Sequence, residues 1–279
     1  MAISINLGSG AGSTNGDTLY DAFTKINTFL STTTKLSNGD LEVNGISVGK
    51  GSGTGAYNTV LGGITPLSSN TTGDSNVAIG TQSLKSNLIG SDNIAVGVNA
   101  LVNNNGSSNI GIGGNAGQGN ISGIGNISIG INANYSNTNL NNTITIGSNA
   151  NCAISDQITL GNTTINSLRC NVQSISSLSD ERDKTDIIEI SEGLEFVNKL
   201  NPVTFTWNQR DGNRIGVKAS GFIAQDLLEL QNDSSIGENL DLVTDIDPLK
   251  LEARYNNLLP VLVKAIQELT ARINVLEGN

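Results

Sequence analysis

The sequence predicts a mainly β amino-terminal part, a β-solenoid or β-roll, followed by an α+β domain that ends in a long coiled-coil helix. Three observations predict this fold class. A short motif recurs about every 17 residues between residues 58 and 168. The composition changes abruptly before Ser179, and a heptad pattern runs through residues 255–276.

The first 57 residues are interpreted as an amino-terminal cap or attachment segment with one short helix. Asp17 is suited to cap that helix, and apolar residues then follow at helical spacing: Leu19, Phe23, Ile26 and Leu30. The glycine-rich stretch before it lacks the G-K-S/T arrangement of a phosphate-binding loop, so nucleotide binding is not expected. The first residues also lack the pattern of a signal peptide, which argues against secretion.

Residues 58–178 are predicted to form the solenoid. The motif occurs as N-T-V-L-G, N-V-A-I-G, N-I-A-V-G, N-I-G-I-G, N-I-S-I-G, T-I-T-I-G and Q-I-T-L-G, and its closing glycines are spaced 18, 17, 16, 17, 17 and 14 residues apart. Alternation of Ile or Val with small residues predicts one short strand per repeat with one apolar face. Stacking would bury that face in a ladder of Ile79, Val96, Ile112, Ile129 and Ile146.

A composition rich in Gly, Asn and Ser is also typical of disorder, but a near-constant period favours the solenoid. Between residues 58 and 178 the only aromatic residue is Tyr135, so the core would be thin. Open ends of a repeat array also promote aggregation. Threefold association would address both problems, and we therefore expect a homotrimer.

Residues 179–279 carry 18 acidic and 10 basic residues, against 7 and 5 in residues 1–178. Helices are expected at 191–200 and 221–230, a strand at 203–207, and a long helix from Pro248 almost to the end, kinked or restarted at Pro260. Its apolar residues follow a strict heptad seam, which predicts partner helices: Tyr255, Leu259, Leu262, Ile266, Leu269, Ile273 and Leu276.

Four ordered motifs in this region carry a family resemblance: S-D-x-R-x-K, L-N-P-V-x-F-x-W, G-F-I-A-Q-D-L and Y-x-x-L-x-P-x-L-x-x-A-I-Q-E-L. Together they resemble the carboxy-terminal intramolecular chaperone domain of phage endosialidases, tailspikes and fibres. The resemblance covers essentially all of residues 179–279. It implies a domain that trimerises, assists folding of the β-structured part, and then cuts the chain.

Carried over to this sequence, the resemblance implies that Ser179 is the nucleophile, that Lys184 is its general base, and that Leu178–Ser179 is the scissile bond. The chain contains no His, so only another base can activate the serine. A lysine serves as a base when desolvation or a nearby positive charge lowers its pKa. Arg182 is expected to contribute such a charge, and Asp180 is the other supporting residue.

One position departs from the family pattern. The family commonly has an apolar residue directly before the lysine, where this chain has Asp183. Because a neighbouring carboxylate favours a protonated amine, this departure predicts cleavage that is slow or absent, and without cleavage the chaperone domain would stay joined to the fibre.

The leading interpretation is a virion protein, a tail fibre or appendage assembled in the host cytoplasm. It would contact other tail proteins through its amino terminus and bind a glycan or protein on the host surface. One alternative is a polysaccharide depolymerase, since Asp74 and Asp92 could lie close together when repeats stack. Another is the head of a bacterial trimeric adhesin, which uses similar repeats.

Composition excludes several other classes. Without His, and with two Cys, neither a zinc site nor a disulfide framework is expected, and no cofactor or metal is assigned. A net charge of -10 argues against nucleic-acid binding, and the lack of an 18-residue apolar run argues against membrane insertion.

Overall fold

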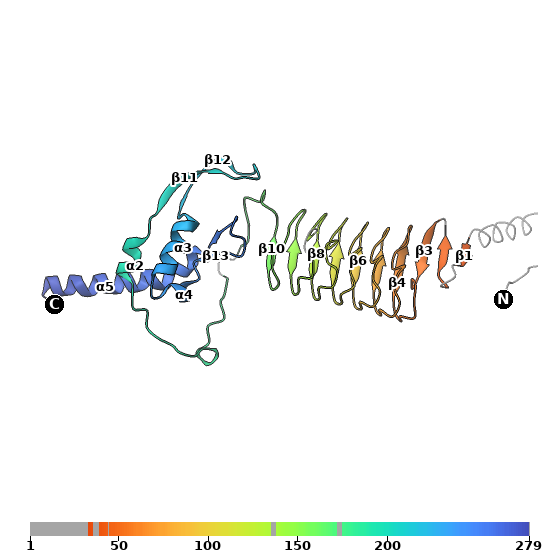
Figure 1. The fold of residues 1–279 in the computed structure, drawn as a ribbon, viewed down its shortest axis with the longest axis horizontal. Coiled ribbons are helices and arrows are strands. Elements are labelled where there is room, and N and C mark those ends of the chain that lie inside the picture. The colour runs from red at the N-terminus through yellow and green to blue at the C-terminus, as the bar shows by residue number, and fades with distance from the viewer. Residues whose placement is uncertain (1–32, 36–38, 44, 135–137, 172–174, 279) are drawn as a thin grey trace, which may run out of the picture. The chain divides into compact units, whose positions relative to one another are not determined.

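A computed structural model describes residues 33–35, 39–43, 45–134, 138–171 and 175–278. The helix expected after Asp17 lies outside these residues. By internal contacts the chain divides into two compact units, Met1–Ser167 and Leu168–Asn279. Each is described below by itself (Figure 1). The domain boundary predicted between Leu178 and Ser179 follows the change in composition and stays a prediction.

The first unit contains a β-solenoid of about six turns, which confirms the predicted fold class. All seven motif copies form strands, and each strand pairs in parallel with the next along the chain. The strands are β4 (Thr59–Gly62), β5 (Val77–Ile79), β6 (Ile94–Val96), β7 (Ile110–Ile112), β8 (Ile127–Ile129), β9 (Ile144–Ile146) and β10 (Ile158–Leu160). Figure 1 shows them stacked in chain order.

Antiparallel strands precede the solenoid at its amino-terminal end. Strands β1 (Thr33–Lys35), β2 (Leu41–Val43) and β3 (Ile46–Gly49) form a meander, and β3 pairs antiparallel with β4. The carboxylate of Asp40 is buried and accepts hydrogen bonds from the backbone N–H groups of Lys50 and Gly51, both at 2.8 Å. This meander covers the first parallel strand, as a cap must if the end of a repeat array is not to stay open.

The predicted Ile/Val ladder forms, but it faces the opposite way from the expectation. Ile79, Val96, Ile112, Ile129 and Ile146 stack in register. In the single chain they lie on the outside, with Ile112 and Ile146 each 40 % exposed. In strands β5 to β9 the middle residue is buried and is smaller than Val or Ile: Ala78, Ala95, Gly111, Ser128 and Thr145.

The limited room inside the coil explains why the Ile/Val ladder faces outward. Leu67, Leu84 and Leu101 from the turns already fill the coil interior, where they are almost fully buried. A Cβ on Gly111 would lie 2.7 Å from the Cγ of Leu101. An Ile at the middle position of a strand would therefore overpack the coil.

A ladder of buried asparagines runs through the solenoid beside the inner row. These are the first residues of the motif, and each Oδ1 accepts the backbone N–H of the equivalent residue in the next turn, at 2.8–3.0 Å. The ladder consists of Asn58, Asn76, Asn93, Asn109 and Asn126, and it ends at Thr143. Their side-chain amides donate to buried carbonyl oxygens such as Gly106 O and Gly123 O. The sequence pattern did not predict this internal role of the motif asparagines.

The second unit is a mixed α/β region followed by a long helix. Its elements are a 3₁₀ turn η1 (Glu181–Asp183), α2 (Leu194–Lys199), β11 (Val203–Asn208), β12 (Ile215–Gly221), α3 (Ala224–Asp233), α4 (Gly237–Leu240), β13 (Val243–Thr244), β14 (Glu252–Ala253), η2 (Tyr255–Leu258) and α5 (Leu259–Glu277). Strands β11 and β12 form an antiparallel hairpin, and β13 pairs antiparallel with β14.

Three helices begin later than predicted, the first being the helix expected at 191–200, which begins at Leu194. The helix expected at 221–230 begins only at Ala224, because Gly221 still pairs in β12. The long helix begins at Leu259 rather than after Pro248, since residues 248–258 contain β14 and η2. Pro260 stands in the first turn of α5, where its missing N–H removes no helical hydrogen bond, so it marks a start and not a kink.

Large apolar side chains form the core of the second unit. Phe196 of α2 is completely buried. It clusters with residues in or next to α3, α4, β13, η2 and the start of α5: Leu227, Ile236, Leu240, Leu242, Val243, Leu258 and Val261. Gly193 lets α2 approach α5, since a Cβ there would lie 2.6 Å from the backbone N of Ala265. The side chain of Glu268 also accepts the N–H of Leu194 at 2.8 Å. Across the described residues, no helix is both long and apolar enough to cross a membrane.

Candidate functional site

A tight turn at the beginning of the α/β region holds the residues predicted to act in catalysis. Asp180 caps the 3₁₀ turn η1, its side chain accepting the N–H of Arg182 at 2.9 Å. Backbone bonds from Asp183 N to Asp180 O and from Lys184 N to Glu181 O close the turn. Five residues after Ser179, the chain has therefore folded back far enough for the Lys184 side chain to reach the serine.

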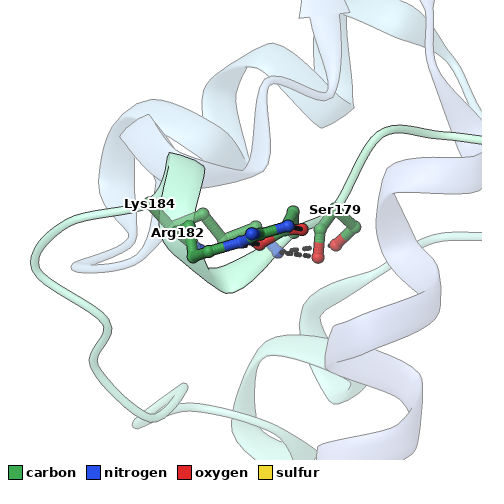
Figure 2. A network of polar contacts seen from close by, with 4 residues as sticks. Ser179, Arg182 and Lys184 are labelled. Atoms are coloured by element: carbon green, nitrogen blue, oxygen red, sulfur yellow. Dashed lines mark hydrogen bonds and ion pairs between the residues drawn. The ribbon is translucent and has the colours of Figure 1, made fainter.

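The structure brings Ser179 and Lys184 into direct contact. Lys184 Nζ lies 2.5 Å from Ser179 Oγ and 3.2 Å from the backbone oxygen of Ser179 (Figure 2). A nucleophile and its base must lie within hydrogen-bonding reach of each other, and this pair meets that requirement. The catalytic roles of the two residues remain predictions.

Arg182 pairs with Asp180, and the role expected for it, a positive charge that acts on Lys184, stays a prediction. Its Nε and Nη2 donate to the two carboxylate oxygens of Asp180 at 2.9 and 2.6 Å. The Arg182 side chain, and then its backbone N–H, hold the pKa of the Asp180 carboxyl below its ordinary value. Asp180 in turn raises the pKa of Arg182. The motif contains both residues, but their ion pair was not predicted; only the capping role of Asp180 has a sequence signal, because Asp is a preferred N-cap residue.

The turn is open to solvent in the single chain. Ser179 through Lys184 are all exposed, and Leu178 on the other side of the predicted scissile bond is fully exposed. Among the described residues, the hydrogen bonds of Ser179–Lys184 stay within that segment. The contact between the two side chains is thus formed by local structure, in a turn that is exposed to solvent.

The predicted heptad residues lie on an uncovered stripe of α5. Val261 and Ala265 are the buried residues of this helix, and they face the core of the unit. The seam residues on α5 stay exposed: Leu259, Leu262, Ile266, Leu269, Ile273 and Leu276. Tyr255 lies before the helix, in η2, where its hydroxyl contacts the backbone N and O of Phe222 at 3.2 and 3.1 Å.

The acids considered for a depolymerase occupy turns of the solenoid. Asp92 N donates to Asp74 O at 3.0 Å, so stacking does place the two residues in adjacent turns. The Asp74 carboxylate accepts the N–H of Ala56, and Asp92 has a left-handed backbone with φ 59°. Both features are ordinary turn functions of Asp.

No metal centre is found in the part of the chain that the structure describes, where no three His, Cys, Asp or Glu residues gather closely enough to hold an ion. The two cysteines, buried Cys152 and exposed Cys170, are not joined in a disulfide.

Fold and site together define a class: a repeat-built β-solenoid followed by a small α/β domain with a Ser–Lys pair at its beginning. Residues 179–234 match the model of the family described as chaperone of endosialidase. The match and the solenoid fit a tailspike- or endosialidase-type protein with a carboxy-terminal chaperone domain, as the sequence motifs predicted. This family is associated with trimeric tail proteins. Comparisons with curated proteins and with solved structures give no match.

Proposed function

We propose that this tailspike-like chain is a homotrimeric tail fibre or appendage protein whose carboxy-terminal domain drives trimerisation and folding and then cuts Leu178–Ser179. The contact between Lys184 Nζ and Ser179 Oγ, at 2.5 Å within the family-matched segment, carries the proposal. The protein would reside in the virion, join other tail proteins through its amino terminus, and bind a glycan or protein on the host surface.

The cleavage would use two steps. The neutral amine of Lys184 removes the proton from Ser179 Oγ, which attacks the carbonyl carbon of Leu178 through a five-membered ring. The C–N bond breaks, the amide nitrogen of Ser179 takes the proton from Lys184, and Leu178 is left as an ester on Oγ. Water then hydrolyses the ester, giving a Leu178 carboxylate and a free Ser179 with its hydroxyl restored.

Exposed apolar surfaces on both units support trimerisation. The uncovered heptad stripe on α5 is suited to pack against equivalent helices. The outward Ile/Val ladder of the solenoid offers a second apolar surface that repeats at every turn. If association covered the Ser179–Lys184 turn, the drier environment would favour the neutral amine that the base role needs.

Mass spectrometry of the purified chain tests the proposal. The wild type is expected to yield two pieces, residues 1–178 and 179–279, whereas Ser179→Ala stays at full length. Ser177→Ala is the matched control, an exposed serine two residues away that should leave cleavage intact. If wild type and Ser179→Ala both remain uncut, self-cleavage is refuted. Native conditions report the oligomer, for which a trimer is expected.

A further inference from the structure

We propose that Asp180 and Arg182 form an ion pair without net charge, here called the clamp, which positions the Lys184 side chain against the Ser179 hydroxyl. This inference rests on the proposed self-cleavage and assigns a separate task to two residues that do not touch the scissile bond.

The clamp follows from the contacts of one carboxylate. Asp180 accepts the N–H, the Nε and the Nη2 of Arg182, so a single side chain fixes both the backbone and the guanidinium of the residue two positions later. A bidentate Arg–carboxylate pair has a defined plane and direction, which a lysine in place of the arginine would not reproduce. The clamp shapes η1, and the end of η1 fixes where the Lys184 side chain starts.

Hydrogen bonds inside the turn matter because the turn makes none to other described residues. All six residues from Ser179 to Lys184 are exposed, and the hydrogen bonds that they make to described residues stay inside the segment. Lys184 therefore reaches Ser179 through the shape of the turn, and the Asp180–Arg182 pair is its one side-chain ion pair.

The Asp180–Arg182 pair also carries no net charge, which matters for the protonation of Lys184. The sequence around Lys184 is rich in carboxylates, with Glu181, Asp183, Asp186 and Glu189 within five residues. An additional unpaired carboxylate at Asp180 would favour the ammonium form, which cannot act as a base. Since Arg182 neutralises Asp180, the clamp orders the turn without adding net negative charge beside the amine.

Three variants separate geometry from charge when the self-cleavage rate is followed against pH. Arg182→Lys keeps the charge but loses the two parallel hydrogen bonds. The cleavage rate at high pH, the plateau, should therefore fall roughly tenfold, while the pH at which the rate is half of the plateau, the midpoint, should not move. Arg182→Gln leaves Asp180 unpaired, and the midpoint should rise by about 0.5 pH unit. Asp180→Asn combined with Arg182→Gln removes both charges and should return the midpoint to the wild-type value. Glu277→Gln, which removes an exposed acid at the end of α5, serves as the control.

Wild-type cleavage by Arg182→Lys would overturn the positioning role. An unmoved midpoint in Arg182→Gln, or failure of the double variant to restore it, would overturn the charge balance. If the wild type itself does not cleave, the proposed self-cleavage fails separately. The Cε resonance of Lys184, followed against pH in the intact variants, then tests the charge balance by the same pattern of midpoints.

Discussion

The two units of the chain are stabilised by different means. The solenoid interior contains small residues, three leucines and a buried asparagine ladder, whose hydrogen bonds recur from turn to turn between Asn58 and Thr143. In the second unit a few large side chains from distant segments meet in one cluster. A repeat that gains stability from hydrogen bonds per turn needs no aromatic core, whereas a domain of about a hundred residues depends on its largest apolar groups.

The largest predicted effect removes the centre of the second core. Phe196→Ala deletes a fully buried aromatic ring, and we expect the free energy of unfolding of this unit to fall by about 3–5 kcal/mol. Fluorescence of Trp207, the chain's only tryptophan, follows this unit during urea unfolding. Hydrogen exchange in the solenoid should not change. A loss of protection in both units would show that their stabilities are not separate.

The second prediction tests the asparagine ladder. Asn109→Ala removes the acceptor of Asn126 N and Nδ2, at 3.0 and 3.1 Å; the buried N–H then loses its hydrogen bond, whereas Nδ2 keeps its bond to the backbone oxygen of Leu140. The solenoid should lose about 1–3 kcal/mol, measured by hydrogen exchange of its ladder amides. Asn103→Ala is the matched control, because Asn103 is exposed and donates one surface bond. Its effect should stay within about 0.5 kcal/mol. Equal losses in both variants would contradict a special role for the ladder.

The two units also differ in how much of their structure the sequence predicts. The repeat period identified all seven solenoid strands and their register, because stacking requires equivalent residues to pair. Alternation could not tell which face of a three-residue strand lies inside. That choice depends on the room left by Leu67, Leu84 and Leu101, which come from the turns. In the second unit, Pro260 was recognised as a break, but the start of α5 depended on the β13–β14 pairing.

The sequence predicted which residues form the candidate site but not how their side chains are arranged. The motif placed Ser179 and Lys184 five residues apart, a distance that an extended chain would not close. The η1 turn closes it, and its cap at Asp180 is a local signal that a sequence can carry. Arg182 could not be assigned by charge alone, since whether it faces Lys184 or Asp180 depends on side-chain orientation.

The smallest predicted effect uses pH to separate the units. Glu192 accepts hydrogen bonds from Ser235 and Ser234 at the end of α3, and the Ser235 hydroxyl chiefly lowers the pKa of this carboxyl below its ordinary value of 4.5. A lowered folded-state pKa contributes stability above the unfolded value, and that contribution disappears as the pH falls through the folded value. The asparagine ladder contains no titratable group.

Below pH 4.5 the Trp207 transition should therefore weaken while exchange of the ladder amides, corrected for intrinsic rates, stays constant. Glu192→Gln should flatten part of this dependence by lowering stability at neutral pH, whereas Glu229→Gln, an exposed acid on α3, should keep the wild-type profile. If Glu192→Gln follows the wild-type profile at every pH, its bonds to the two serines do not stabilise the unit. If instead the ladder amides lose protection first, the acid-sensitive part of the chain is the solenoid, and the contrast between the two units is reversed.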